Sequence, residues 1–463
     1  MVVVGFLVDG RVRGPGDRSL AEDAARGMAG GGIQTHRFEL VPTPVQSPRI
    51  LHTPLGPYTH TRSDLVEPAP DPAARFDAEI PDACVVRLAD QMAEHVRREA
   101  IGTLHAIGLD LPGRVARLVS ERTGIPYCVT PRATDLHPEV ANAQVREVLR
   151  GARHLVLFDE ALRPAVEAAF PIRAGDAPLR LRILRRGIDL ELFMPLPRQE
   201  RGSAAVGLCE RPELAARLAD IDWGRACVVL CAQHPGETEG FGEFLFALPE
   251  LLRQQPLLQV LVLPLGPIPA ATDRLRAALA AGKSELLQGV LQESERYQSL
   301  LDHLGRLHAE RRTDAWWQCA ARLEPERRVR FLGAVSRQEF ARLVALADVL
   351  VIPGTRPRPL SHLPYEALAA GVLSVASAHS GMGPLAQMLA DNISAEIAAL
   401  CVLRDDAPAV SELEDKLGRF VRLRPELGER LRALAVRKFD IRQTATDLRR
   451  LYAEPARATV ARA

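Results

Sequence analysis

Residues 347–377 read ADVLVIPGTRPRPLSHLPYEALAAGVLSVAS. Two short apolar runs, 349–352 and 372–376, contain many β-branched residues, which is typical of strands buried on both faces. Between them, residues 363–370 fit a helix that Gly371 ends. A strand, a crossover helix and a second strand form the βαβ unit of a parallel sheet. This stretch therefore predicts a doubly wound α/β domain.

The same alternation of apolar runs and helical patterns extends through most of the chain. A break rich in proline and glycine at residues 195–202 separates two series, so we expect domains over 1–200 and 201–438. Residues 41–75 have no periodicity and are expected to form long loops. The expected strands are 2–8, 33–40, 103–107, 127–130 and 154–158 in the first series, and 227–231, 258–263 and 329–332 in the second.

Composition excludes several classes of protein. With 463 residues, 47% of them apolar, the chain can bury two cores. A formal net charge of +1 lacks the basic excess of nucleic-acid and membrane-surface binders, so neither partner is expected. The seven cysteines form no C-x-x-C pair, which favours a reduced, cytoplasmic setting without a cysteine-based zinc site. We expect no signal peptide and no transmembrane segment.

Four segments of the second series stand in an order known from one enzyme family. They are VRFLG at 329–333, ADVLVIP at 347–353, EALAAG at 366–371 and SVAS at 374–377. This pattern resembles the donor-domain core of the family 4 retaining glycosyltransferases (glycosyl transferases group 1), which have the GT-B fold. Further matching pieces are LHA at 104–106, GIP at 124–126, PRATD at 131–135, RGID at 186–189 with Phe193 and Pro195, and LGP at 265–267.

The resemblance implies two Rossmann-like, doubly wound domains that face each other across a cleft. The acceptor would bind to residues 1–200 and the nucleotide-sugar donor to 201–438, and a helix within 439–463 would cross back to the N-terminal domain. The implied activity is hexosyl transfer, with retention, from a nucleotide-diphosphate sugar to a sugar, lipid or small-molecule acceptor. No cofactor and no metal are expected beyond the nucleotide sugar as co-substrate.

Sugar transfer requires that the charge growing on the leaving diphosphate be stabilised. Backbone N–H groups at helix N-termini can do this without a metal. Gly14 and Gly16 before the first predicted helix, and Ser380, Gly381 and Gly383 after residue 377, suit this role, although both segments can also be ordinary turns. Glu366 matches the ribose-binding glutamate of the family, and its alternative role is a favourable charge in the first turn of a helix.

The chain departs from the family pattern at three donor positions. Gln233 stands where the family has arginine, Glu239 where it has lysine, and Arg358 where it has the first of two glutamates. A carboxylate near a diphosphate repels it by roughly 4 kcal/mol before screening, at an effective dielectric of ~20. Arg356 and Arg358 can compensate by binding phosphates. Alternatively, Glu239 and Arg358 form an ion pair that fills the former donor site.

Three residues of the first series are the candidates for acceptor binding and catalysis. His105 ends a predicted strand and either contacts an acceptor or is a hydrogen-bonded core histidine. Arg132 replaces the histidine of the family's H-G-x-D loop, and Asp135 either binds acceptor or caps a helix. The only D-x-D, at 220–222, is expected to be solvated rather than to hold a metal.

Two functions of different classes remain open at this point. One is a metal-independent retaining sugar transferase. The other is a catalytically inactive glycosyltransferase-like subunit that binds or stabilises a protein partner, which the changes at 233, 239 and 358 favour.

Overall fold

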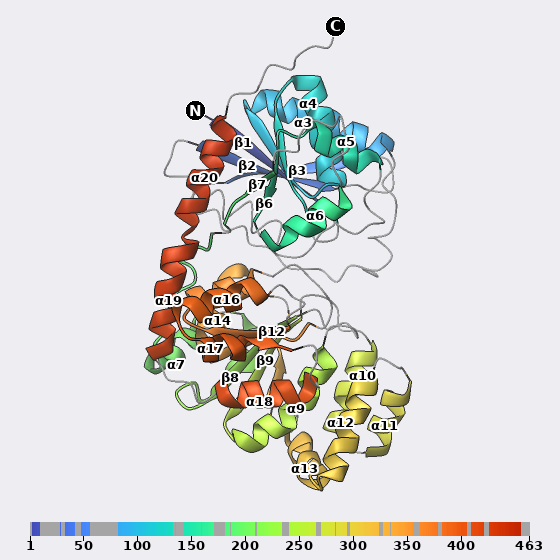
Figure 1. Cartoon of the computed structure of the whole chain (residues 1–463), viewed down its shortest axis with the longest axis vertical. Helices are drawn as coiled ribbons and strands as arrows, with labels where there is room; N and C mark the ends of the chain where they lie inside the picture. Colours follow the sequence, from blue (N-terminus) through green and yellow to red (C-terminus); the bar gives the residue numbers. More distant parts are fainter. Residues whose placement is uncertain are drawn as a thin grey trace. The chain divides into compact units, whose positions relative to one another are not determined.

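The computed structural model describes residues 2–9, 28, 33–41, 48–55, 82–132, 135, 143–158, 160–170, 181–185, 187–208, 211–233, 240–264, 270–282, 284–293, 297–323, 327–333, 335–354, 362–377, 382–404, 409–420 and 426–454. They form two compact units (Figure 1). Unit 1 contains the described residues up to Asp189 and again from Phe439 onward, and unit 2 contains Leu190–Lys438. The chain thus leaves unit 1 shortly before the proline-rich break at 195–202.

Unit 1 is built on a seven-stranded sheet in the order β3-β2-β1-β4-β5-β6-β7. The strand β3 pairs with β2 in antiparallel fashion, and the other neighbours are parallel. The strands are β1 (Val2–Asp9), β2 (Ile33–Val41), β3 (Arg49–Leu55), β4 (Thr103–Ile107), β5 (Tyr127–Thr130), β6 (His154–Leu157) and β7 (Leu181–Ile183).

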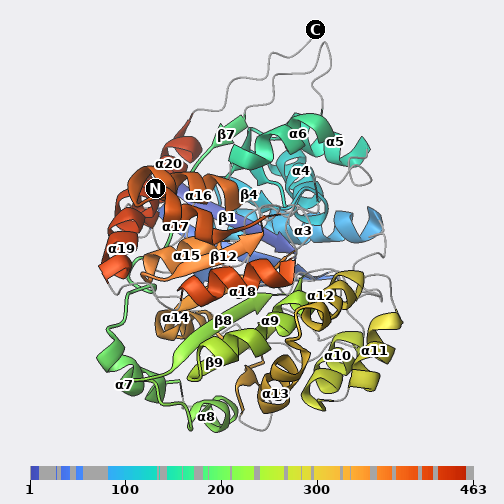
Figure 2. The ribbon, with the colours of Figure 1, turned by 60° about the horizontal axis from the view of Figure 1, so that its bottom comes forward.

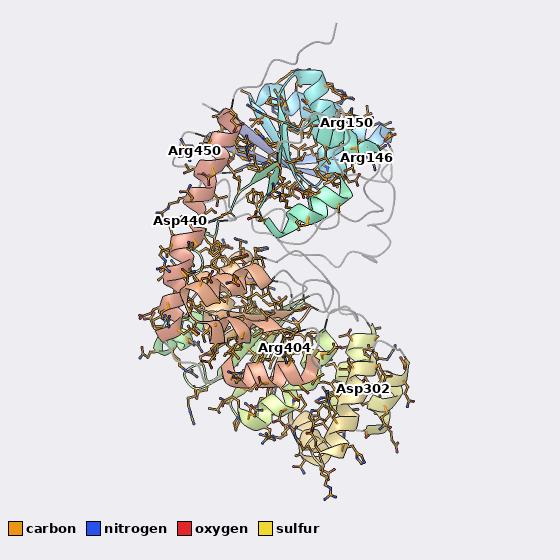
Figure 3. All side chains as sticks on the ribbon, in the orientation of Figure 1. Arg146, Arg150, Asp302, Arg404, Asp440 and Arg450 are labelled. Carbon is orange, nitrogen blue, oxygen red and sulfur yellow. The ribbon has the colours of Figure 1, made fainter. Side chains whose placement is uncertain are left out.

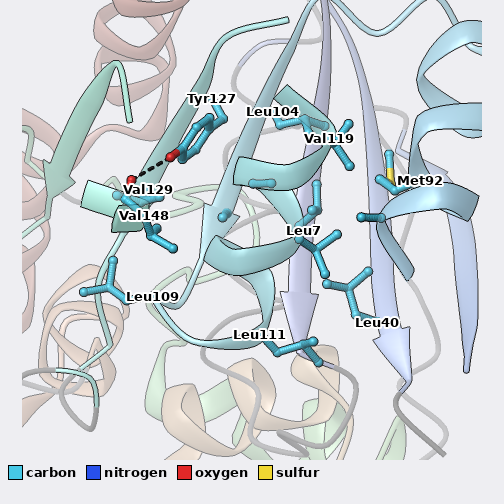
Figure 4. Close-up of a cluster of buried hydrophobic side chains, with 14 of the residues drawn as sticks. Leu7, Leu40, Met92, Leu104, Leu109, Leu111, Val119, Tyr127, Val129 and Val148 are labelled. Carbon is cyan, nitrogen blue, oxygen red and sulfur yellow. Dashed lines mark hydrogen bonds between the residues drawn. The ribbon is translucent and has the colours of Figure 1, made fainter. Parts of the chain in front are cut away.

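Helices cover both faces of this sheet. On one face, apolar side chains of α3 and α4 pack with those of the central strands, and Figure 4 shows this cluster. The Tyr127 hydroxyl donates a hydrogen bond of 2.6 Å to the Val148 carbonyl, which satisfies its polar end inside the core. The helices are α3 (Asp82–Arg98), α4 (Leu111–Thr123), α5 (Ala143–Gly151), α6 (Arg163–Ala169) and α20 (Ile441–Ala453).

The other face is covered by α20, near the end of the chain (Figure 1). Its Leu448 and Leu451 pack with strand residues that include Phe6 and Val156. The helix begins after Asp440, labelled in Figure 3, whose carboxylate accepts a hydrogen bond of 2.9 Å from the backbone N–H of residue 442. The last helix is therefore part of the core of unit 1.

A short backbone contact joins α20 to the segment where the chain leaves unit 1. The Ile188 N–H donates to the Phe439 carbonyl at 2.7 Å, and the Ile441 N–H donates to the Ile188 carbonyl at 3.2 Å. A Cβ at Gly187 would lie 2.4 Å from the Ile441 Cα. Glycine is required there because the two backbones touch.

Unit 2 contains a second, fully parallel sheet of six strands in the order β10-β9-β8-β11-β12-β13. The strands are β8 (Cys227–Gln233), β9 (Leu258–Pro264), β10 (Val329–Phe331), β11 (Val349–Ile352), β12 (Leu373–Ser377) and β13 (Val402–Leu403). The helices beside them are α7 (Arg201–Val206), α8 (Pro212–Leu218), α9 (Phe241–Gln254), α14 (Arg337–Leu346), α15 (Leu363–Ala369), α16 (Met382–Asn392), α17 (Ala395–Cys401), α18 (Ala409–Phe420) and α19 (Glu426–Phe439).

The segment between β9 and β10 forms four further helices, gathered beside α9 (Figure 2). Trp316 is buried against Phe246, and its indole N–H donates to the Phe246 carbonyl at 3.3 Å. The helices are α10 (Ala270–Ala280), α11 (Ser284–Gln292), α12 (Gln298–Ala309) and α13 (Thr313–Leu323).

The doubly wound α/β prediction is confirmed in both units, with one correction. The expected long loop over 41–75 contains the strand β3, which lies at the edge of the sheet. An edge strand tolerates Pro54, because one side of its backbone has no ladder to complete. The proline-rich composition of residues 41–75 therefore led to the prediction of a loop where this strand lies. Among the described residues, no helix has the length and apolarity needed to cross a membrane.

Candidate functional site

Each sheet has one point where the strand order reverses. In unit 1 the reversal lies between β1 and β4, and in unit 2 between β8 and β11. In open α/β sheets, ligands bind beyond the carboxyl ends of the strands at such a point. The candidate sites therefore lie after Ile107 in unit 1, and after Gln233 and Ile352 in unit 2.

Seven predicted site residues fall outside the described part of the chain. The proposed ion pair between Glu239 and Arg358 lies there as well. These residues are Gly14, Gly16, Glu239, Arg356, Arg358, Ser380 and Gly381. Gln233 is the last residue of β8, and its side chain is likewise outside the description. Gly383 lies in the first turn of α16, where a Cβ would meet no atom within 4 Å.

At the carboxyl edge of unit 1, Asp135 joins the loops that follow β4 and β5. Its Oδ2 accepts hydrogen bonds from the Leu109 N–H at 2.9 Å and from the Arg132 N–H at 2.7 Å. The Arg132 guanidinium also pairs with its Oδ1 at 3.2 Å. Asp135 is only 2% exposed. This carboxylate holds the backbone of two loops at the sheet edge, and the Arg132 side chain, 17% exposed, reaches solvent beside it.

The Arg132 guanidinium lies against Gly108, the first residue after β4. A Cβ at Gly108 would lie 2.9 Å from the Arg132 Nε, and the residue has a φ of +111°. A side chain there would be strained and would displace the arginine. Glycine at this position therefore leaves room for the Arg132 guanidinium at the end of β4. Among the described residues of unit 1, Arg132 is the only positively charged residue that was predicted for the site.

His105 is a hydrogen-bonded core residue of β4, which was one of its two predicted roles. Its Nδ1 lies 2.5 Å from the Tyr452 hydroxyl, and its Nε2 lies 2.8 Å from the Thr130 hydroxyl. Burial lowers the pKa of His105 to about 3, so the ring is neutral at physiological pH. Both nitrogens are engaged by the chain itself, and this leaves none for an acceptor in this conformation.

In unit 2, Glu366 lies in the first turn of α15 and is 1% exposed. Its Oε1 forms an ion pair with the Arg337 guanidinium at 3.0 Å, and the His362 Nε2 lies 3.7 Å from the same oxygen. The Arg337 guanidinium also lies over the Phe193 ring, 5.4 Å from its centroid. A buried carboxylate requires such a partner because removal from water disfavours its charge.

The helix α14 positions Arg337 as its first residue. Ser336 caps this helix: its hydroxyl accepts from the Glu339 N–H at 3.2 Å, while the Glu339 carboxylate accepts from the Ser336 N–H at 2.6 Å. The sequence alone assigned no role to Arg337, because its partner Glu366 is distant in sequence and leaves no local signal.

Two aspartates from the sequence motifs have structural roles in unit 2. The Asp348 carboxylate accepts from the Val228 N–H at 2.8 Å and pairs with Arg201 at 2.9 Å, which ties β11 to β8. In the D-x-D segment, Asp220 pairs with the Arg330 guanidinium at 2.5 Å, and this arginine lowers the pKa of the Asp220 carboxyl. Both aspartates are exposed, as expected from the sequence, and Asp220 is also held by this arginine.

No protein-family model matches the chain. No curated protein sequence matches it either. Solved structures are similar throughout its length. Sucrose-phosphate synthase from Thermosynechococcus elongatus has a TM-score of 0.58 and 14% identity, covering 98% of each chain. HepE from Anabaena, in complex with UDP and glucose, has a TM-score of 0.56 and 14% identity, covering 98% of this chain and 100% of its own.

An α,α-trehalose-phosphate synthase (UDP-forming) from Burkholderia vietnamiensis has a TM-score of 0.55 and 14% identity, covering 98% of this chain and 99% of its own. At these identities the likeness concerns the backbone. It shows that the chain has the two-unit α/β architecture of GT-B glycosyltransferases.

Proposed function

We propose that the chain is a glycosyltransferase that moves a hexose from a nucleoside-diphosphate sugar to an acceptor hydroxyl with retention. The observation that carries the proposal is the likeness of the whole chain, over both units, to structures that include UDP and UDP-glucose complexes. In the reaction, the bond from the anomeric carbon to the diphosphate breaks. The acceptor oxygen forms a bond on the same face, and its proton leaves with the diphosphate.

In this proposal unit 2 binds the donor. Glu366 accepts hydrogen bonds from the ribose hydroxyls, and Arg337 holds its carboxylate in place through the 3.0 Å ion pair. The two functions are compatible because a carboxylate can accept about four hydrogen bonds. Arg356 and Arg358 bind the phosphates together with the backbone around Gly383, and we propose that no metal takes part.

Unit 1 binds the acceptor at the carboxyl edge of its sheet. Arg132 is the charged side chain that contacts the acceptor. The ion pair with the buried Asp135 orients its guanidinium, which still reaches solvent. His105 does not contact the acceptor in this proposal. It is a positioning residue that fixes the end of β4 through its hydrogen bonds to Tyr452 and Thr130.

A second function is favoured by the charges of the donor segment. Glu239 replaces the expected lysine, and Glu366 is already paired with Arg337. Both features suit a chain that has lost donor binding and acts as a binding or stabilising subunit for a protein partner. The two functions make opposite predictions for nucleotide binding.

Thermal unfolding of the full chain with UDP, GDP, ADP, TDP, CDP and their common sugar conjugates distinguishes them. A ligand at 100 times its Kd stabilises a folded protein by ~2.7 kcal/mol, which is readily measured. The transferase predicts a shift with one base, abolished in Glu366→Gln and unchanged by EDTA. Glu396→Gln is the matched control, since Glu396 is exposed and lies in the first turn of α17.

Retention is tested on the same protein once a donor is known. The anomeric configuration of the transferred sugar, or of the hydrolysed donor, is read by proton NMR at early times. A product of inverted configuration would refute retention. No shift with any nucleotide, in a protein that unfolds cooperatively, would refute donor binding and favour the inactive subunit.

A further inference from the structure

Three metal-ligating side chains gather in unit 1 at a position that the candidate acceptor site does not use. His36 lies on β2 and is paired in register with Gly5, in the amino-terminal half of β1. His52 lies on β3 opposite Phe38, so His36 and His52 share one face of the sheet. Glu99 follows directly after α3, the helix that packs on this face. The residues of the acceptor site lie instead at the carboxyl ends of β4 and β5.

The ligand atoms of these side chains are close together. One nitrogen of each histidine and a carboxylate oxygen of Glu99 lie within 4.8 Å of one another. The His36 Nδ1 is 2.8 Å from the His52 Nε2, and the His52 Nδ1 is 3.9 Å from the Glu99 Oε1. Ligands ~2.1 Å from a tetrahedral ion are roughly 3.4 Å apart. Small side-chain rotations would therefore bring the three groups into a first coordination shell.

Burial of His36 provides a second, independent observation. The residue is 1% exposed, and its Nε2 has no hydrogen-bond partner among the residues that the structure describes. The nitrogen that faces His52 is Nδ1, and the unpartnered Nε2 shows that no second hydrogen bond from the described residues holds this ring in place. The His52 and Glu99 side chains are 19% and 24% exposed, so they leave a route from solvent to the cluster.

We propose that His36, His52 and Glu99 bind a divalent first-row transition-metal ion, with Zn²⁺ as the best match. Two imidazoles and one carboxylate are a ligand set that zinc takes in proteins, with water in the fourth position. Calcium and magnesium are poor matches, because they prefer oxygen ligands only. The inference is independent of the proposed sugar transfer.

A neighbouring arginine holds the Glu99 carboxylate in place. The Arg98 Nε donates to the Glu99 Oε1 at 2.9 Å and orients that carboxylate. His95 lies beside the cluster, with its ring centroid 5.5 Å from that of His52, and its Nδ1 contacts the Arg98 guanidinium.

The test is calorimetric titration of the tag-free full chain, freed of metal, with zinc chloride. We expect one ion per chain at a site that His52→Gln and Glu99→Gln each weaken at least tenfold. These two side chains are partly exposed, so the variants should fold even if His36→Gln does not. Glu94→Gln on the exposed side of α3 and His308→Gln on the exposed side of α12 are the matched controls, and both should bind as the unaltered chain does.

Cobalt(II) supplies an independent readout. A tetrahedral site with nitrogen and oxygen ligands gives visible d–d absorption without the intense bands of cobalt–thiolate bonds. Thiolate bands would assign the metal to cysteines and overturn the proposal. It would also be overturned if the unaltered chain bound no zinc, or if both ligand variants bound zinc with unchanged affinity. Neither result depends on whether any nucleotide binds.

Discussion

The Nδ1 of His105, in the middle of the unit 1 sheet, lies 2.5 Å from the hydroxyl of Tyr452 in the last helix. The two rings meet edge to face with centroids 5.8 Å apart. Both residues are buried, so this polar contact lies wholly inside the core. It joins residues 347 positions apart in the sequence, and it explains why a histidine is tolerated in a strand with apolar neighbours.

Tyr452→Phe removes only the hydroxyl and leaves His105 without that partner. A buried polar group deprived of its hydrogen bond costs about 1–3 kcal/mol, and we expect the free energy of unfolding to fall by that amount. Urea unfolding measures the change. Arg450→Gln, at an exposed position of α20, should change stability by less than about 0.5 kcal/mol. Equal stability of Tyr452→Phe and the unaltered chain would contradict the role given to this contact.

Gly371→Ala should be strongly destabilising. Gly371 has a φ of +74°, and a Cβ there would lie 3.0 Å from the Gly428 carbonyl oxygen. Strain and overlap together should cost about 2 kcal/mol or more. Gly289→Ala is the matched control, because Gly289 lies within α11 with nothing within 4 Å of the added Cβ. It should raise stability by about 0.4–1 kcal/mol. Calorimetry of the two variants tests both expectations. Similar melting temperatures for Gly371→Ala and Gly289→Ala would contradict the strain assigned to Gly371.

The ion pair between Arg337 and Glu366 should contribute strongly to unit 2. Arg337→Met leaves a buried carboxylate without its arginine and should cost about 3 kcal/mol or more. Most of that loss should be recovered in the double variant with Glu366→Gln, because no buried charge then remains. Arg342→Met on the exposed side of α14 should cost less than about 1 kcal/mol. Additive effects of the two substitutions in denaturant unfolding would show that the side chains do not interact.

Glu414 should make stability depend on pH. Burial, with the nearby Glu250 carboxylate, raises its pKa from 4.5 to about 7. The His303 Nε2 is 3.7 Å away, but burial lowers the pKa of this ring to about 4, so it offers no charge at neutral pH. The folded chain therefore holds a proton that the unfolded chain loses between pH 4.5 and 7. Stability falls across this window as pH rises.

Glu414→Gln removes the ionisable group and with it the loss of stability at higher pH. We expect it to stabilise the chain at pH 8 by up to roughly 3 kcal/mol and to change little at pH 4. Glu396→Gln, at an exposed position, should show no such pH dependence. Unfolding measured from pH 4 to 8 tests this, and a constant difference between Glu414→Gln and the unaltered chain would refute the assignment.

The sequence predicted most of the regular structure, because buried parallel strands are continuous apolar runs. The strands β8, β9 and β11 were expected within two residues of their observed ends. The edge strand β3 was missed because its run contains three polar residues and a proline. Its pairing depends on β2, which lies outside the local pattern. The helix α3 was missed as well, although its single apolar face has the spacing typical of a surface helix.

The site was less predictable than the fold. Glu366 was identified from its motif, but its partner Arg337 was not, because an ion pair between two helices leaves no periodic signal. The motif also drew attention to His105 without distinguishing a core residue from a ligand-binding one. The cluster of His36, His52 and Glu99 joins two strands and a helix end, so only the folded chain brings it together.

The position of α20 determines when unit 1 can complete its core during synthesis at the ribosome. Phe6 and Val156 are made before Leu190–Lys438, whereas the leucines of α20 that cover them are made after it. All of Leu190–Lys438 leaves the ribosome before them. Unit 2 can therefore fold while unit 1 still exposes one face of its sheet, and chaperones that bind apolar surface have that whole interval in which to act.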